Sequence, residues 1–212
     1  MKEFLLIRHA ESMGNAGYKT SSTEENPLTL FGQEQANKLS IFLYQKYNGL
    51  NLPDLVVHSH YKRAYQTMES FVRDKNFLVE QWDVNEFKYL SSVKYANTSD
   101  EDRRPSREKY WERMDSDYHD DDTAESYNDL ITRTGHMLES LLSCTHKRIF
   151  VFSHGQFIKA MWLIMVNEGL SGKLPTMSEF YNFTNSVLIP NIGIIKVIFK
   201  DGEYSISQLS AV

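Results

Sequence analysis

The sequence has very little cysteine: Cys144 is the only one among 212 residues. A single thiol cannot form a disulfide within the chain, so the folded state must be stabilised by its core. A chain without disulfides suits a reducing compartment, and we expect a cytoplasmic protein.

Positive charge and long apolar runs are also scarce. A formal net charge of -5 argues against a protein that binds nucleic acid or anionic membranes, because both ligands select basic surfaces. The longest apolar stretch, residues 157–166, contains Lys159 and is too short to span a bilayer. The apolar residues Phe4–Ile7 are too few for a secretory signal peptide. We expect neither nucleic acid nor a membrane as a partner, and either a monomer or a homodimer.

The chain contains enough apolar material for one domain over residues 1–212, since 41% of its residues are hydrophobic and 13% aromatic. Short apolar runs alternate with stretches of helical spacing, which is typical of parallel βαβ units. The runs cover residues 3–7, 55–58, 77–82, 148–152 and 194–199. The pattern predicts an α/β fold of three layers, with a mostly parallel central sheet flanked by helices.

Two helices and an insertion are predicted between these runs. Residues 29–47 carry apolar side chains on one face, and Thr29 is a plausible N-cap. A second helix is expected within residues 124–142. Residues 91–122 break the alternation with a charged, helical insertion, which forms either a lid or wall over a site or a surface excursion. Its acidic run, residues 115–122, is expected to be solvated.

The strand ends carry the polar residues of interest. One run ends in Arg8-His9, a second in His58-Ser59-His60 with Arg63 just beyond, and a third in Ser153-His154-Gly155. Ligands of α/β sheets bind at the carboxyl ends of the strands, so two arginines and two histidines are expected to converge there. Arginines bind phosphate through forked donors, and an imidazole can attack phosphorus when one ring nitrogen is unprotonated.

Other phosphoryl-transfer routes lack their residues. There is no Walker loop and no GxSxG, and Cys144 has no arginine at the spacing of a tyrosine-phosphatase loop. Asp115 and Asp117 lie in a polar region instead of at a strand end, so histidine remains the candidate nucleophile. His58 and His60 would share one side of a strand without a third metal ligand, and structural or pocket-rim roles are favoured for both.

Five segments, in this order, resemble the motifs of the histidine phosphatase superfamily, which includes phosphatases and the cofactor-dependent phosphoglycerate mutases. The likeness extends from residue 3 to about residue 190. The segments are Arg8–Ser12 with Asn15, Leu28–Ala36 (LTxxGxxQA), Ser59–Thr67 (SxxxRAxQT), Glu125-Ser126 with Arg133, and Ser153–Gly155. The resemblance implies a phosphoglycerate mutase-like fold.

The resemblance also implies roles for individual residues. His9 would be the nucleophile that becomes phosphorylated, and Arg8, Arg63 and His154 would bind the phosphoryl oxygens. Asn15 and Gly155 would add contacts to the substrate. Glu86 would be the proton donor, with Glu11, Glu80 and Asp83 as nearby rivals. This scheme needs no metal and no cofactor, and its substrate would be a small phosphorylated molecule.

Departures from the family pattern favour hydrolysis over isomerisation. Ala10 and His60 replace a common glycine and proline without removing a chemical group. Glu86 leads into Phe87-Lys88 and so lacks the arginine that mutases commonly place beside it. A phosphoglycerate mutase and a non-catalytic phospho-ligand binder remain the alternatives. The insertion offers Arg103, Arg104, Arg107 and Lys109, either to a second anionic group or to the neighbouring carboxylates Glu101, Asp102 and Glu108.

Overall fold

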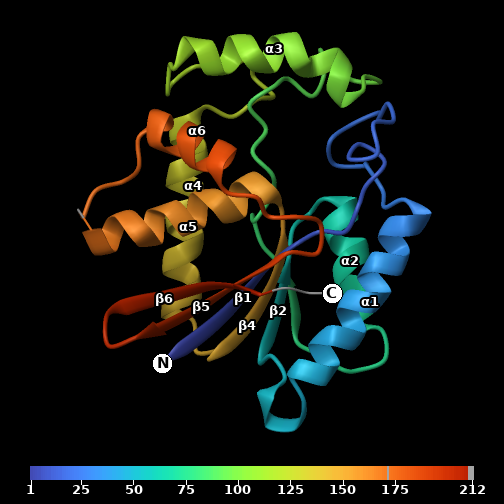
Figure 1. Ribbon diagram of the computed structural model, residues 1–212, viewed down its shortest axis with the longest axis vertical. Coiled ribbons are helices and arrows are strands. Elements are labelled where there is room, and N and C mark those ends of the chain that lie inside the picture. The colour runs from blue at the N-terminus through green and yellow to red at the C-terminus, as the bar shows by residue number, and fades with distance from the viewer. Residues whose placement is uncertain (171, 210–212) are drawn as a thin grey trace.

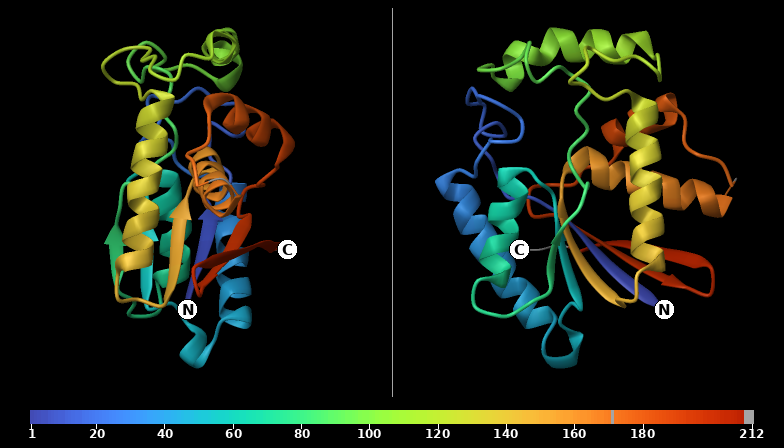
Figure 2. Two further views of the ribbon diagram at one scale, coloured as in Figure 1. Left: turned by 90° about the vertical axis from the view of Figure 1, so that its left-hand side faces the viewer. Right: turned by 180° about the vertical axis from the view of Figure 1, so that it is seen from behind.

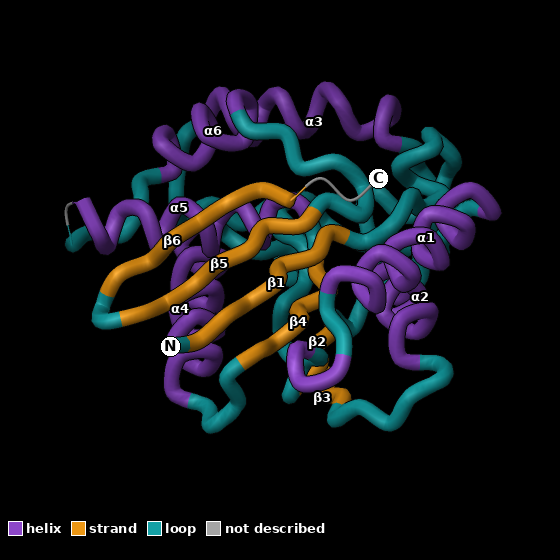
Figure 3. The backbone as a smooth tube through the Cα atoms, turned by 60° about the horizontal axis from the view of Figure 1, so that its bottom comes forward, coloured by secondary structure: helices purple, strands orange, loops and turns teal. Residues whose placement is uncertain are grey.

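The centre of the computed structural model, which describes residues 1–170 and 172–209, is a six-stranded sheet with the order β3-β2-β4-β1-β5-β6 (Figure 3). Neighbouring strands among the first four are parallel, whereas β5 and β6 run antiparallel to their neighbours. The strands are β1 (Lys2–Arg8), β2 (Leu55–His58), β3 (Val79–Gln81), β4 (Arg148–Ser153), β5 (Ile194–Lys200) and β6 (Glu203–Leu209). The prediction of an α/β fold with a mostly parallel sheet is confirmed.

Helices cover both faces of this sheet (Figures 1 and 2). One face packs against α1 (Leu30–Lys46) and α2 (Lys62–Val72), and the other against α4 (Tyr127–Ser143) and α5 (Gly155–Leu170). A short 3-10 helix, η1 (Gly49–Asn51), precedes β2, and α6 (Met177–Ser186) follows α5. The predicted cap of α1 is confirmed, since the Thr29 side chain accepts a hydrogen bond from the Gly32 backbone at 2.9 Å.

The strands supply two separate cores. Phe4 and Leu6 of β1 pack toward α4 and α5, while Leu5 and Ile7 pack toward α1 and α2. Because both faces are covered, the run is apolar throughout instead of alternating with polar residues. Strand β6 was not predicted, because its residues are exposed or half-buried and mostly polar, as expected at the edge of a sheet.

Helix α3 (Asp100–Arg113) is the helix of the predicted insertion and lies across one end of the molecule (Figures 1 and 2). A capping box between Ser99 and Asp102 starts this helix, and Tyr110 is its only buried side chain. The acidic run 115–122 is solvated only in part: Asp120 accepts from the Ser91 backbone at 3.0 Å, and Asp121 binds the Ser91 hydroxyl. These two carboxylates tie the two ends of the insertion together.

None of the helices within residues 1–170 and 172–209 combines the length and apolar character needed to cross a bilayer. The prediction of one domain over residues 1–212 extends to residues 171 and 210–212, which lie outside the described part of the chain.

Candidate active site

His9 follows directly on β1, where its backbone N–H continues the pairing with β4 by donating to Ser153 at 3.0 Å. The two ring nitrogens have different partners. Nδ1 lies 2.7 Å from the Ala10 carbonyl oxygen, which can only accept, so Nδ1 carries the proton. Nε2 accepts a hydrogen bond from Arg63 Nε at 3.0 Å. The arrangement fixes the tautomer in which Nε2 holds the lone pair of a nucleophile.

The surroundings of His9 keep its ring neutral. The side chain is buried, and burial together with the charges of Arg63 and Arg8 lowers its pKa well below the usual 6.5. A neutral imidazole at neutral pH is the form that can attack phosphorus.

Two arginines enter the site from different elements. Arg63, in the first turn of α2, donates to the Thr23 carbonyl at 2.6 Å, and burial lowers its pKa to about 10. Arg8 donates from Nη1 to the Ile189 carbonyl at 2.6 Å, while its buried Nε has no partner. Gly155 lies beside Arg8, since a Cβ there would be in van der Waals contact with Nε at 3.4 Å. Both arginines stay cationic at neutral pH, as an anion site requires.

His154, which directly follows β4, is completely buried, and its ring centroid lies 5.1 Å from that of His9. Its Nε2 lies 2.7 Å from the Ser59 hydroxyl. That hydroxyl donates its own hydrogen to Asn85 Oδ1 at 2.6 Å and accepts from the Tyr61 backbone at 3.1 Å. Nε2 must therefore be the donor to Ser59, because the hydroxyl hydrogen is already committed.

Because Nε2 carries the ring proton, the second ring nitrogen of His154, Nδ1, is unprotonated and has a lone pair. Nδ1 is buried and has no hydrogen-bond partner among the described residues. Burial and the charges of Arg63 and Arg8 lower the pKa of His154 well below 6.5, so the ring is neutral before an anion arrives. An unpaired buried acceptor is unusual in a native structure and marks a place where a proton or a ligand is expected.

Glu86 comes from the loop after β3 and is held by the first turn of α5. Its Oε1 accepts from the backbone N–H groups of Gln156 at 3.0 Å, Phe157 at 3.3 Å and Phe87 at 3.1 Å. Within the described residues, Oε2 makes no hydrogen bond and is free for proton transfer. Three donors on one oxygen therefore fix the direction of the other.

Arg133 of α4 supports the turn that carries Glu86. It forms a two-point ion pair with Glu125, at 2.8 and 3.0 Å, and donates to the carbonyl oxygens of Asp83 at 3.0 Å and Asn85 at 3.2 Å. The motif of a glutamate with a downstream arginine thus has a structural purpose: it holds the chain immediately before Glu86.

Asn15 lies in the loop after His9 and is oriented by its neighbours. Its Oδ1 accepts from the Ser12 backbone at 3.2 Å, the Ser12 hydroxyl at 3.1 Å and Asn191 Nδ2 at 3.2 Å. The side-chain nitrogen Nδ2 of Asn15 makes no hydrogen bond to the described residues, although its backbone N–H donates to the Ser12 hydroxyl at 3.3 Å. Asn15 can therefore donate to a ligand, as the sequence predicts.

These groups surround one cavity of about 630 Å³, which we call the site cavity. The strand ends, the loop after His9, the first turn of α5 and the insertion all contribute to its lining. The predicted residues on it are Arg8, His9, Asn15, Arg63, Glu86 and Gly155, and α3 adds Asp100, Glu101, Arg103 and Arg107. His154 lies behind His9 and does not line the cavity itself.

Comparison with known proteins now identifies the family. A model of the histidine phosphatase superfamily (branch 1) matches residues 4–207. The chain belongs to the histidine phosphatase superfamily. No curated protein matches its sequence.

Solved structures share the fold of this superfamily member. The alpha-ribazole phosphatase from Shigella flexneri is 18% identical with a TM-score of 0.75, over 99% of this chain and 96% of that one. A phosphoserine phosphatase from Entamoeba histolytica, in complex with 3-phosphoglyceric acid, is 22% identical with a TM-score of 0.69, over 99% and 98%. A mycobacterial glucosyl-3-phosphoglycerate phosphatase is 17% identical with a TM-score of 0.72, over 98% of both chains. At these identities the likeness shows the fold alone.

The rivals of Glu86 take other places in this histidine phosphatase superfamily member. Glu11 accepts from the N-cap hydroxyl of α1 at 2.8 Å, Glu80 accepts from a neighbouring indole at 2.8 Å, and Asp83 accepts from a neighbouring amide at 2.7 Å. Glu86 is the one of these four carboxylates that lines the site cavity.

His58 and His60 do not share one side of a strand, so that expectation is wrong. Strand β2 ends at His58, which is buried against the edge of Tyr65, whereas His60 is exposed. Neither lines the site cavity, so a rim role is excluded, and His58 has a structural one. In the part of the chain that the structure describes, no three histidine, cysteine or carboxylate side chains come together as a possible metal site.

Sequence reasoning missed several residues that position the site. The Thr67 hydroxyl donates to the Arg63 carbonyl at 2.7 Å and accepts from the Ala10 backbone at 3.0 Å, which joins α2 to the loop after His9. Because Thr67 lies four residues after Arg63 on α2, the sequence could have indicated its contact with Arg63. Asn85 and Asn191 act through contacts distant in sequence, and no local signal marks them.

Proposed function

We propose that this protein is a phosphomonoester hydrolase that forms a phosphohistidine on His9. The observation that carries the proposal is the neutral His9 ring, whose Nε2 accepts a hydrogen bond from the buried Arg63 and whose pKa is lowered by burial and by the charges of Arg63 and Arg8. Arg8 and Arg63 would bind the phosphoryl oxygens and offset their charge while the group is transferred.

In the first step the Nε2 lone pair attacks phosphorus, and the bond from phosphorus to the leaving oxygen breaks. Glu86, in its protonated form, gives its proton from Oε2 to that oxygen. Because Arg63 Nε donates to His9 Nε2 before substrate binds, that hydrogen must turn to a phosphoryl oxygen when phosphorus approaches.

In the second step a water molecule attacks the phosphohistidine. The Glu86 carboxylate takes a proton from the water as its oxygen bonds to phosphorus, and the electron pair of the N–P bond returns to Nε2. Phosphate then leaves and the enzyme is restored. Each step uses groups of this chain and water, in keeping with the predicted scheme that needs no metal or cofactor.

The proposal includes the other expectations from the sequence. The chain would act as one domain, in which residues 91–122 form a wall of the site, and its substrate would be a small phosphorylated molecule. It would be a cytoplasmic monomer or homodimer. The wall is supported by the four α3 residues on the lining of the site cavity.

Hydrolysis of para-nitrophenyl phosphate tests the proposal. We expect turnover by the wild type and none by His9→Ala, which removes the nucleophile. Acid-quench experiments with labelled substrate should find an acid-labile, base-stable phosphoryl group on His9. If the wild type is inactive but binds phosphate, the non-catalytic alternative is correct. Retention of wild-type rates by His9→Ala would exclude the mechanism.

The phosphoglycerate mutase alternative gains one observation, since Arg103 and Arg107 of α3 do line the site cavity. Both are already engaged: Arg107 binds both oxygens of Asp100 at 2.7 and 2.8 Å, and Arg103 donates to Thr98 at 3.0 Å. Hydrolysis is therefore favoured. Isomerisation of 3-phosphoglycerate in the presence of 2,3-bisphosphoglycerate, if much faster than phosphate release from a panel of monoesters, would establish the mutase instead.

A further inference from the structure

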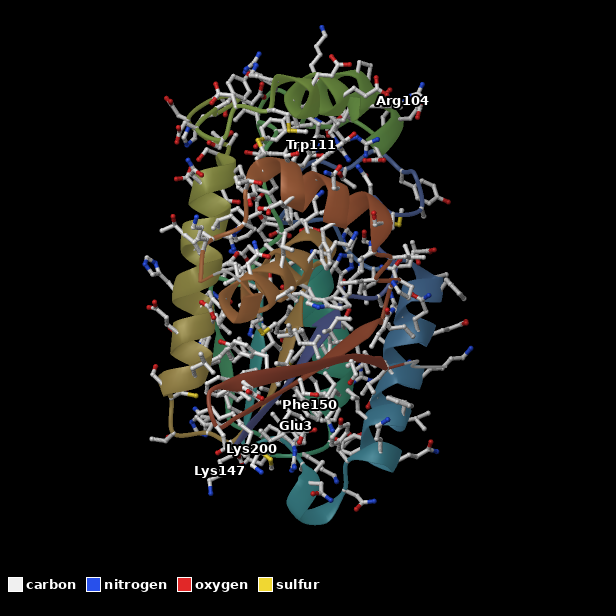
Figure 4. The ribbon with its side chains drawn as sticks, turned by 60° about the vertical axis from the view of Figure 1, so that its left-hand side comes forward. Glu3, Arg104, Trp111, Lys147, Phe150 and Lys200 are labelled. Atoms are coloured by element: carbon white, nitrogen blue, oxygen red, sulfur yellow. The ribbon has the colours of Figure 1, made fainter. Side chains whose placement is uncertain are left out.

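A second cavity, of about 670 Å³, adjoins the site cavity. The two share the residues Tyr89, Arg107, Gln156 and Lys159 on their linings. The second cavity lies between α3 on one side and α5 and α6 on the other. Figure 4 shows Arg104 and Trp111 on α3, at the end of the molecule opposite Glu3, Lys147 and Lys200. The combined space exceeds what one phosphoryl group needs and can hold a leaving group of some size.

The cations of the second cavity differ in how they are paired. Arg104 contacts Glu101 at 2.8 Å, and Arg107 contacts Asp100 at 2.7 Å. Lys159 has no carboxylate partner among the described residues. Its ammonium group donates to the Thr184 carbonyl of α6 at 2.9 Å, which leaves two of its three N–H donors unused.

Lys159 lies one turn beyond the part of α5 that faces the phosphoryl site. Gly155 faces Arg8, since a Cβ built on it would lie 3.4 Å from Arg8 Nε, and the Gln156 backbone donates to Glu86. Lys159 is about 6 Å further along the helix axis than Gly155. Burial beside Arg8 lowers the pKa of Lys159, while the charge of Glu86 acts in the opposite direction. The half-buried ammonium therefore lies within electrostatic reach of the catalytic groups and is destabilised until an anion joins it.

Gln156, on the same face of α5 as Lys159, has a second polar atom with unused hydrogen-bonding capacity. Its Oε1 is buried and receives no hydrogen bond from residues 1–170 or 172–209, and the residue lines both cavities. A buried acceptor without a donor is costly, so a ligand that brings a hydroxyl or an amine there would be stabilised.

From this cluster we infer that the substrate carries a second anionic group, a carboxylate or a second phosphoryl group, that binds Lys159 while the first phosphoryl group lies at His9. This inference rests on the proposed phosphatase function and names the class of leaving group. A hydroxyl or amine between the two anionic groups would donate to Gln156. The paired arginines of α3 are not needed for the contact.

Two pairs of substrates test it. 3-Phosphoglycerate and glycerol 3-phosphate differ by a carboxylate in place of a hydroxymethyl group, and fructose 1,6-bisphosphate and fructose 6-phosphate differ by a phosphoryl group. We expect the wild type to favour the member with two anionic groups in at least one pair. In Lys159→Met the kcat/KM ratio of that pair should fall about tenfold to hundredfold, the range of a charge-assisted hydrogen bond. Lys159→Arg should restore it.

The variant Lys109→Met is the matched control, because Lys109 is exposed on α3 and lines neither cavity. It should leave the ratios unchanged. If Lys159→Met lowers kcat/KM equally for both members of each pair and also lowers the melting temperature, Lys159 has only a structural role through its hydrogen bond to α6. That result would overturn the inference. Absence of wild-type turnover on para-nitrophenyl phosphate would instead overturn the phosphatase function and this inference with it.

Discussion

Two neutral histidines buried at the candidate site should make the fold sensitive to mild acid. Burial and nearby positive charge lower the pKa of His9 and His154 well below 6.5 in the folded protein. In the unfolded chain both rings regain their ordinary pKa and take up protons as the pH falls through 6.5. The unfolded state then binds more protons than the folded state, so the free energy of unfolding must fall.

The size of the effect follows from linkage. Each ring that stays neutral in the folded protein lowers the free energy of unfolding by about 1 kcal/mol between pH 6.5 and 5.5, because the unfolded ring is half protonated at pH 6.5 and mostly protonated at pH 5.5. Two such rings give about 2 kcal/mol over this interval, a large part of the 5–15 kcal/mol that is typical of domains. Carboxylates with lowered pKa, such as Glu3, respond near their unfolded value of 4.5, so a window above pH 5.5 isolates the histidines.

Urea unfolding at pH 7.5, 6.5 and 5.5 measures this slope. His154→Gln removes one ring and should reduce the loss of stability between pH 6.5 and 5.5 by about 1 kcal/mol, while His9 and His58, whose pKa burial also lowers, contribute to the remaining loss. His136→Gln, at an exposed position on α4, is the matched control and should leave the slope as it is. A stability that stays constant from pH 7.5 to 5.5 in the wild type would show that the folded protein protonates both rings, and the assignment of a neutral nucleophile would be wrong.

The sequence predicts the parts of the fold whose signal is local. The apolar runs of β1, β2 and β4 identify the buried parallel strands, because strands covered on both faces cannot alternate with polar residues. Thr29 identifies the start of α1 through capping chemistry. Strand β6 gives no such signal: its polar residues are typical of an exposed edge, and its pairing depends on β5.

The convergence of these polar residues at the strand ends was also predictable, whereas the contacts that orient them were not. Arg8, His9 and His154 end buried strands or follow them directly, and the carboxyl ends of parallel strands meet at one edge. The tautomer of His154, by contrast, depends on Ser59 and Asn85, whose positions result from the packing of separate loops. The surroundings of Lys159 were equally unpredictable. Its spacing in the sequence places it on a helix, but the second cavity beside it depends on how α3, α5 and α6 pack together.

Two further predictions follow from the geometry of the site. Glu86→Gln should slow phenyl phosphate about a hundredfold to ten-thousandfold and para-nitrophenyl phosphate far less, because nitrophenolate needs little help from a proton donor. Equal losses on both substrates would assign Glu86 to binding instead. The other prediction concerns His154, whose bare Nδ1 lone pair would repel an anionic oxygen. To bind one, the ring must gain a proton at Nδ1, since Nε2 already donates to Ser59. Binding of sulfate, which does not itself titrate near neutral pH, should therefore take up about one proton per site. Calorimetry at pH 7.5 in two buffers of different ionisation enthalpy measures this uptake. Sulfate that binds without a proton would remove His154 from the groups that contact the phosphoryl oxygens.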